Sequence, residues 1–349
     1  MTKSESAESK IYCNFNDVRV RCKYYNDNYD AIFTYVHTAG KTQLIKDPGE
    51  RICRFCGKRY PDVRFRKKAH AIPELIGNKE FVLSNECDTC NDFFGRELED
   101  NFGKYLGLGR TLSQIFGKEG VPSFKTKNEQ FRIDFSNVGL VIKQCEQDGG
   151  TIEMLDHTLH FHTIRDTYIP IAVYKTFVKM ALSLIPFDKL IYFKDTIKWL
   201  LEDSNLSSKY DMSNYAHAIE RYIPGPNPLP LRACGFIRKD DSLPIPYYQF
   251  LLEFYNYSFQ IIVPCDIKDK CLYNLDYIDF VCIPGSDELT TTVWPFGKPT
   301  SKLIDLSNKN KIKGETLDLY LNFDYCEMHE GHGESITDFF NKNGINLPK

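Results

Sequence analysis

Two pairs of cysteines and one histidine are the residues whose types and spacing point most directly to chemistry. Cys53 and Cys56 form one C-x-x-C pair, Cys87 and Cys90 form a second, and His70 lies roughly midway between the pairs. A C-x-x-C pair holds two sulfurs on one tight turn, and two such pairs complete the four-thiolate set of a structural zinc. The alternatives are two unrelated pairs or a redox motif, but a redox C-x-x-C is expected beside a βαβ pattern, which is missing here. We therefore predict a structural zinc site with four cysteine ligands.

The surroundings of His70 favour a catalytic role over that of an ordinary packed histidine. The residue follows a basic run, because residues 51–68 contain eight Lys or Arg and one Asp. Such a run attracts a phosphate backbone. A neutral imidazole accepts a proton from water near pH 7, and a bound Mg²⁺ or Mn²⁺ stabilises a phosphodiester under attack. These residues predict metal-dependent hydrolysis of a phosphodiester.

The order of these residues resembles the zinc-stapled branch of the HNH endonucleases. The resemblance covers about residues 50–125 and rests on the two cysteine pairs and on the strings Ala69-His70-Ala71-Ile72-Pro73-Glu74, Gly77-Asn78, Ser84-Asn85 and Glu86-Cys87-Asp88-Thr89-Cys90-Asn91. It implies a ββα-metal fold, in which two strands and a helix surround one catalytic Mg²⁺ or Mn²⁺ ion. It also implies that His70 is the general base, that Asn85 orients it and that Asn91 is a ligand of the ion.

One position departs from the pattern of that family. Many members carry Asp or Glu immediately before the histidine as a metal ligand, whereas this chain has Ala69. Since a hard divalent ion prefers oxygen ligands, we expect Glu86 or Asp88 to supply the missing oxygen. The alternative is an inactive site, in which case the protein is a zinc-dependent nucleic-acid-binding protein. A third interpretation is a zinc domain that binds another protein.

Basic residues near His70 are candidates for contacts with the substrate backbone, which we expect to be DNA. They are Arg64, Arg66, Lys67, Lys68, Arg110 and Lys118. A one-metal site cuts one strand, so cleavage of a duplex requires a homodimer or two successive cuts.

Length, charge and cysteine use limit the class of protein. The chain has 349 residues and a net charge of −3, so it is long enough for two domains and has no global attraction to nucleic acid. The first ten residues are polar, unlike a signal peptide, and no apolar run approaches the length of a membrane span. The remaining cysteines are scattered, as in proteins of a reducing compartment. We expect a cytoplasmic protein without membrane contact.

The apolar patterning predicts an α+β protein with four parts. Residues 1–10 are expected to be a disordered lead, 11–48 a short β lead-in, 49–125 the nuclease module and 126–349 a larger α+β domain. We expect the larger domain to recognise a substrate, a protein or a small activating molecule, by analogy with bacterial anti-phage and restriction-like nucleases.

The expected elements follow from periodicity and from proline and glycine positions. In the lead-in, strands are expected at 11–15, 18–22 and 31–36. The nuclease module should contain a helix at 93–106. In the larger domain we expect helices at 169–184, 188–202 and 335–341, a β-meander at 131–163, and further strands at 247–254, 257–263, 277–283 and 317–325. His160 and His162 share one strand face, and we expect a polar surface there in preference to a second metal site.

Overall fold

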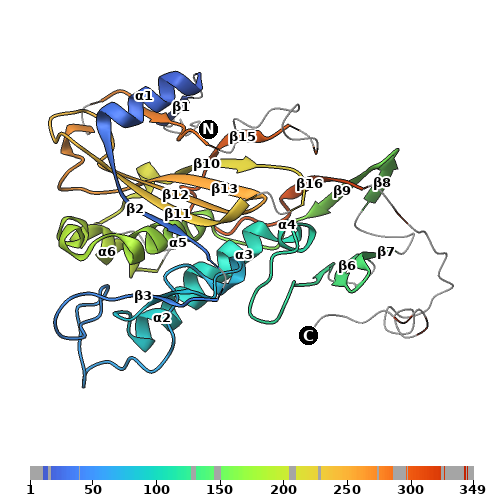
Figure 1. Cartoon of the computed structure of the whole chain (residues 1–349), viewed down its shortest axis with the longest axis horizontal. Helices are drawn as coiled ribbons and strands as arrows, with labels where there is room; N and C mark the ends of the chain where they lie inside the picture. The colour runs from blue at the N-terminus through green and yellow to red at the C-terminus, as the bar shows by residue number, and fades with distance from the viewer. Residues whose placement is uncertain are drawn as a thin grey trace, which may run out of the picture.

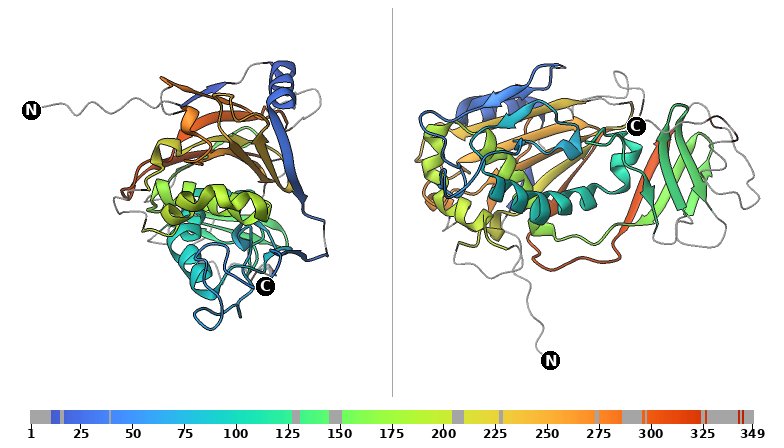
Figure 2. Two further views of the ribbon diagram at one scale, coloured as in Figure 1. Left: turned by 90° about the vertical axis from the view of Figure 1, so that its left-hand side faces the viewer. Right: turned by 90° about the horizontal axis from the view of Figure 1, so that it is seen from below.

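Three layers make up the main body of the protein, whose structure is a computed structural model (Figures 1 and 2). A six-stranded sheet forms the first layer, helix α5 lies beneath it, and residues 40–112 form the third layer. The structure describes residues 11–14, 17–38, 40–126, 131–144, 151–203, 210–226, 229–272, 275–285, 296, 298–323, 326, 342 and 344.

The six-stranded sheet has the order β15-β10-β13-β12-β11-β2, and every neighbouring pair in it is antiparallel. Its strands are β2 (Tyr29–Val36), β10 (His217–Tyr222), β11 (Leu229–Arg238), β12 (Tyr248–Tyr255), β13 (Tyr257–Val263) and β15 (Thr300–Asp305). Along β12, Phe250 and Leu252 join the main core, whereas Leu251 packs on the opposite side. Because both faces are covered, β12 and β13 are buried along almost their whole length, including their polar residues Gln249 and Gln260.

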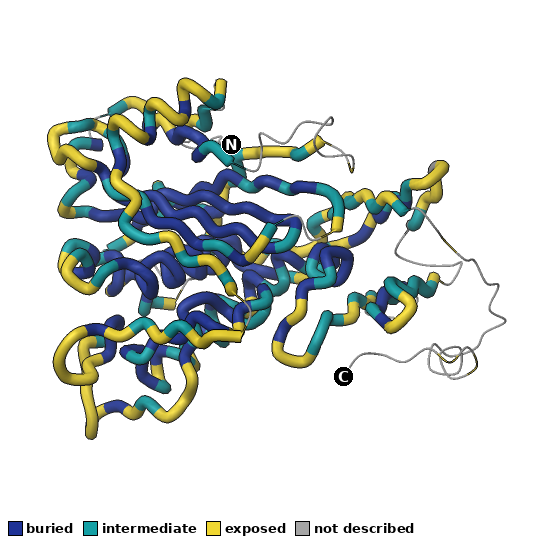
Figure 3. The backbone as a smooth tube through the Cα atoms, viewed as in Figure 1, coloured by how far each residue is buried: buried dark blue, intermediate teal, exposed yellow. Residues whose placement is uncertain are grey.

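Helix α5 (Pro170–Leu184) is buried at every one of its residues, as Figure 3 shows by its dark blue tube. Pro170 suits the first turn of a helix, and the helix ends just before Pro186. The predicted helix at 169–184 is therefore confirmed. The next predicted helix is wrong in its first half, because η3 (Phe187–Phe193) is 3₁₀-helical and only α6 (Lys194–Leu200) is α-helical.

The third layer contains a hairpin followed by one long helix. Residues 69–71 pair antiparallel with β4 (Phe81–Leu83), through Ala71 N to Phe81 O and Leu83 N to Ala69 O, each at 3.0 Å. Strand β3 (Gln43–Ile45) pairs with β4 in parallel. The helix runs through α2 (Asp88–Phe94), a π-helical segment η2 (Gly95–Glu99) and α3 (Asp100–Leu106). This hairpin and helix confirm the predicted ββα unit.

Two smaller sheets extend from one end of the main body, at the right of Figure 2. One consists of β5 (Phe124–Lys125), β6 (Phe131–Ser136) and β7 (Gly139–Gln144), and the other of β8 (Thr151–Leu155), β9 (Thr158–Ile164) and β16 (Thr316–Asn322). The predicted strands exist, but they belong to two sheets instead of one meander, because β9 pairs with β16 from the end of the chain.

The lead-in differs from its prediction in two ways. Residues Val18–Asn28 form helix α1, not a strand, because Asp17 caps its start by accepting a hydrogen bond from Arg19 N at 2.8 Å. The lead-in is also not a separate unit, because its strands pair with strands of the larger domain. Strand β1 (Ile11–Asn14) pairs with β14 (Ile278–Val281), and β2 pairs with β11.

The remaining elements are short. They are η1 (Glu74–Ile76), α4 (Leu108–Leu112), η4 (Ser213–Tyr215) and η5 (Lys270–Leu272). The helix predicted at 335–341 lies outside the described residues. Among the helices that the structure describes, none is long and apolar enough to cross a bilayer.

Arg54 joins the third layer to the end of α5. Its side chain is buried against Asp47, and its Nη1 donates to the carbonyls of Leu182 at 2.9 Å, Ser183 at 2.8 Å and Ile185 at 3.0 Å. The last carbonyls of a helix lack partners within the helix, so a cation there satisfies them and favours the helix dipole.

We expect Arg54→Met to destabilise the fold by about 3 to 5 kcal/mol, because it leaves Asp47 buried without its charge partner. Urea unfolding followed by circular dichroism measures this change. Arg59→Met is the matched control, because Arg59 pairs with Glu50 on the surface and should cost less than about 1 kcal/mol. Equal costs for the two variants would contradict the role assigned to Arg54.

Candidate functional site

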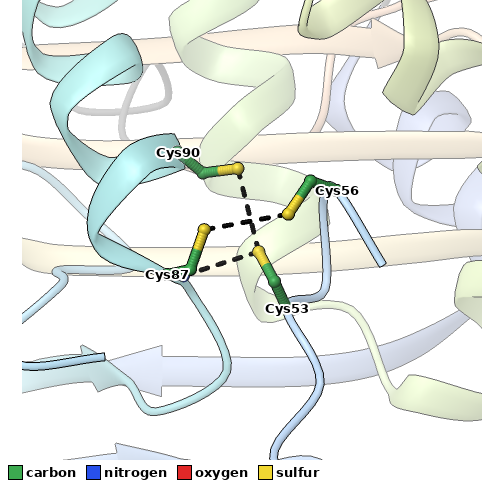
Figure 4. Close-up of side chains that lie close together, drawn as sticks. All are labelled: Cys53, Cys56, Cys87 and Cys90. Atoms are coloured by element: carbon green, nitrogen blue, oxygen red, sulfur yellow. Dashed lines mark hydrogen bonds between the residues drawn. The ribbon is translucent and has the colours of Figure 1, made fainter. Parts of the chain in front are cut away.

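The four predicted cysteines converge on one point (Figure 4). Cys53 and Cys56 lie on a turn closed by Gly57 N to Cys53 O at 2.9 Å, and Gly57 has the left-handed φ of 69° that such a turn requires. Cys87 is the residue that precedes α2, and Cys90 lies in its first turn. The sulfurs of Cys53 and Cys90 are 3.8 Å apart, and those of Cys56 and Cys87 are 3.7 Å apart.

These distances fit a zinc ion. Tetrahedral coordination with Zn–S bonds of about 2.3 Å separates two sulfurs by roughly 3.8 Å. Three of the four cysteines are buried, and all four sulfurs lie within 4.8 Å of one another. Among the described residues, this is the one group of three or more His, Cys, Asp or Glu side chains compact enough to hold an ion. The cluster supports the predicted structural zinc.

His70 lies on the first strand of the hairpin, opposite Val82. Its side chain is 11% exposed, and its Nε2 is 3.6 Å from Oε1 of Glu74. Glu74 begins the 3₁₀ turn η1, which folds the chain back so that its carboxylate, 36% exposed, meets the ring. The histidine therefore has an acidic neighbour on one nitrogen and lies at the edge of the solvent.

The comparison with known families agrees with this arrangement. Residues 53–106 match the model of a family described as HNH endonuclease. This segment is an HNH endonuclease domain. No curated protein and no solved structure matches the chain.

Asn78 lies beside the second nitrogen of the His70 ring in the HNH domain. Its Oδ1 accepts hydrogen bonds from the backbone amides of Glu80 at 3.0 Å and Phe81 at 2.9 Å, so its Nδ2 must face the other way. That Nδ2 donates to the backbone carbonyls of Ile72 and Phe81 and lies 3.4 Å from Nδ1 of His70. Because the Glu74 carboxylate beside Nε2 only accepts, we assign the proton of the neutral ring to Nε2, which leaves Nδ1 unprotonated.

The electrostatic surroundings keep the ring neutral near pH 7. Burial lowers the pKa of His70 below its ordinary value, and the charges of Lys68 and Lys179 lower it further, whereas Glu74 raises it. A neutral imidazole is the form that accepts a proton.

Asn85, predicted to orient His70, is turned toward the zinc-binding turn instead. Its Oδ1 accepts from Asp47 N at 3.1 Å and Ser84 Oγ at 2.7 Å, and its Nδ2 donates to Ile52 O at 3.2 Å. Among the described residues these partners do not include the His70 ring, and the orienting role of Asn85 stays a prediction. Asn85 joins the end of β4 to the chain around the first cysteine pair, and Asn78 is the amide beside the ring.

The two acids offered as replacements for the one expected at Ala69 have different surroundings. Both carboxylate oxygens of Glu86 are buried, and the group is ion-paired with Lys179 at 3.3 Å. Burial raises the pKa of Glu86 to about 7. A catalytic ion must also contact solvent and substrate, and the buried carboxylate of Glu86 cannot reach such a position. The prediction of Glu86 as a metal ligand is therefore corrected. Asp88 is half-buried, and its Oδ1 accepts from the backbone amides of Arg66 and Lys67.

Asn91 stays available as a metal ligand of the HNH domain. It lies one turn after Asp88 on α2 and is half-buried. Residues three apart share one face of a helix, so both side chains project from the same side of α2.

A basic groove of about 500 Å³ runs along the edge of the hairpin. Its lining includes Ala69 beside the catalytic candidate, and no acidic residue of the described chain lines it. Its cationic lining residues are Lys46, Arg51, Arg66, Lys67 and Lys68. Arg51 stacks over the ring of Phe65 at 4.7 Å, which holds its guanidinium at the groove wall. This surface suits a phosphate backbone.

The other predicted cations lie elsewhere. Arg64 and Lys118 are exposed outside the groove lining, and Arg110 is turned inward, between Gly103 and Gly117. Burial lowers the pKa of Arg110, and its Nε is buried without a hydrogen bond within the described part of the chain.

Sequence reasoning missed Glu74, Asn78 and Lys179. Glu74 and Asn78 belong to the strings that carry the family resemblance, so their closeness to His70 in the sequence could have identified them. Lys179 is distant in sequence, and no local pattern identifies it.

The histidines of β9 form a polar cluster, as expected. His160 and His162 both contact Oδ1 of Asp318 on β16, at 3.1 Å and 2.8 Å. His329 and His332, the other histidine pair of the sequence, lie outside the described residues.

We expect the purified protein to bind a single zinc ion per chain, and Cys90→Ser to lose both the zinc and about 4 kcal/mol or more of stability. Elemental mass spectrometry and urea unfolding measure the two effects. Cys22→Ser should retain the zinc, because Cys22 is an exposed free thiol on α1. Retention of zinc by Cys90→Ser would exclude the four-thiolate site.

Proposed function

We propose that this protein is a metal-dependent endonuclease that hydrolyses phosphodiester bonds, and that its substrate is DNA. The observation that carries the proposal is the pairing of His70 with Glu74 and Asn78 on the hairpin of an HNH domain. The basic groove beside Ala69 supports a polyanionic substrate.

In this proposal His70 is the general base. Its Nδ1, which carries no proton in the neutral ring, takes a proton from the attacking water. Its Nε2–H faces Glu74, whose negative charge stabilises the imidazolium that forms, much as a buried acid supports the histidine of a catalytic triad. Asn78 lies beside Nδ1, but it donates its amide hydrogens to Ile72 O and Phe81 O, so the lone pair of Nδ1 stays free for that proton.

Asn91 and Asp88 are the residues that we propose hold the catalytic Mg²⁺ or Mn²⁺ ion. The amide oxygen of Asn91 and the second carboxylate oxygen of Asp88 would suit a hard cation, which prefers oxygen ligands. When bound, the ion supplies positive charge to the phosphate as it gains a fifth bond. Asp88 is already fixed by the amides of Arg66 and Lys67, so its second oxygen has a defined direction.

The wider role follows from the build of the chain. An HNH domain joined to a larger domain is typical of nucleases whose cutting is directed or restrained, and we propose an anti-phage or restriction-like effector in the cytoplasm. The larger domain would bind a protein or a small activating molecule. Cutting both strands of a duplex would require a homodimer or successive cuts.

We expect His70→Ala to reduce metal-dependent nicking of plasmid DNA by roughly 10²- to 10⁴-fold, because the attacking water loses its base. Binding of DNA, measured by fluorescence anisotropy, should change little, since the basic groove is untouched. His162→Ala is the control, because this histidine lies on a distant sheet and should leave nicking unchanged.

The outcomes separate the candidate functions. DNA binding by the wild type without nicking, in either metal, would favour the inactive zinc-dependent binding protein. No binding of DNA at low salt would favour a zinc domain that binds another protein.

The pH profile tests the partner of the base. Cleavage should fall as the pH drops through the pKa of His70, which burial lowers from the ordinary value of a histidine. Because the Glu74 carboxylate raises that pKa, Glu74→Gln should move the acidic limb to lower pH and also reduce the plateau rate. Initial nicking rates from pH 4.5 to 8, taken with a fixed metal concentration, measure both. An acidic limb at the same pH in Glu74→Gln and wild type would show that Glu74 does not act on His70.

A further inference from the structure

Lys179 belongs to the larger domain, yet its ammonium group lies against the backbone of the HNH hairpin. It is on the third turn of α5, its side chain is 1% exposed, and its Nζ donates to the backbone carbonyl of His70 at 2.6 Å. The same Nζ is 3.3 Å from Glu86 and 3.6 Å from Glu99. An ammonium group has three hydrogens to donate, and here three oxygens surround it.

The hairpin leaves the His70 carbonyl in need of such a donor. The backbone bonds of this pair of strands join Ala69 and Ala71 to β4, while His70 sits opposite Val82 between them. In an antiparallel pair, the backbone groups of such an intervening residue point away from the partner strand. A buried carbonyl without a donor is costly, so Lys179 is what allows this peptide to be buried in this orientation.

The other two oxygens fix Lys179 to the parts of the HNH domain that surround the hairpin. Glu86 precedes the second cysteine pair, and Glu99 ends the π-helical segment η2. The ammonium group therefore joins the strand of the base, the zinc-binding turn and the long helix. Among the described side chains, Lys179 is the cation that pairs with the Glu86 carboxylate.

We propose that Lys179 is a positioning residue of the nuclease reaction: by holding the His70 carbonyl, it sets the direction in which the ring of the base projects. The inference rests on the proposed function. The peptide that follows His70 is fixed on one side by Lys179 and on the other by Ala71 N, so the Cα–Cβ bond of the base has little freedom. A misplacement of a catalytic group by about 1 Å is enough to cost about 10² in rate.

The same helix offers a matched control. Lys175 lies one turn earlier on α5, is equally buried, and donates to Glu202 O at 2.9 Å while its ammonium group lies over Trp199. These contacts join Lys175 to α6 and the residue Glu202 that follows it, and not to the His70 strand. Replacing either lysine with methionine removes a buried charge from the same helix, so a general loss of stability affects both variants.

The test compares nicking kinetics of the full-length, zinc-loaded protein as wild type, Lys179→Met, Lys175→Met and the double variant Lys179→Met/Glu86→Gln. The double variant avoids leaving Glu86 as a buried, unpaired charge, and so keeps the test available if the single variant fails to fold. We expect both Lys179 variants to lose about 10²-fold in kcat with KM within about threefold, because the groove that binds DNA is unchanged. Lys175→Met should keep the wild-type kcat.

Wild-type kcat in the folded double variant would overturn the inference and leave Lys179 as a charge partner of Glu86 alone. Equal losses of kcat in the Lys175 and Lys179 variants would also overturn it, since they would report general destabilisation. A wild type that does not nick would overturn the proposed function itself, whereas a wild type that nicks and loses activity on His70→Ala keeps that function whatever Lys179 does.

Discussion

The complete burial of α5 is the constraint on which the rest of the structure depends. All of its residues are buried, the charged Lys175 and Lys179 included, so the helix must be covered on all sides. The six-stranded sheet covers one side and the helix of the HNH domain another. Phe102 of that helix, Phe177 of α5 and Phe259 of the sheet meet ring against ring, with centroids 4.9 to 6.0 Å apart. The HNH domain and the larger domain therefore share one core.

This shared core explains why two cations lie buried at the interface of the layers. Arg54, from the zinc-binding turn, satisfies the last carbonyls of α5, and Lys179, from α5, satisfies the carbonyl of His70. Each donor comes from the layer opposite its acceptor, so neither layer has its buried carbonyls satisfied without the other. If residues 49–125 were separated from the rest of the chain, the apolar face of α2–α3 would be exposed. The carbonyl of His70 and the last carbonyls of α5 would then lose their donors.

The sequence predicted the parts of the site that depend on local spacing. The cysteine pairs, His70 and α5 are each recognisable because the residues that mark them lie a few positions away or repeat with the period of a helix. Val18–Cys22 looked like a strand because a short alternation of apolar and charged residues fits a helix face as well. Glu74 and Asn78 were within the quoted strings, but their approach to His70 depends on the turn at Pro73. Lys179 depends on tertiary packing alone, and so no pattern in the sequence identified it.

These contacts also connect the cysteine cluster to the hairpin of the HNH domain. A zinc ion on the four cysteines would hold the start of α2 to the turn around Cys53, and Asn85 joins the chain around that turn to the end of β4. The zinc site is thus connected to one strand of the hairpin and Lys179 to the other. His70 lies on the strand that has no direct connection to the cysteine cluster, and Lys179 of α5 is what holds this strand in place. For this reason the larger domain is part of the catalytic apparatus of the enzyme that we propose, whatever ligand or partner it also binds.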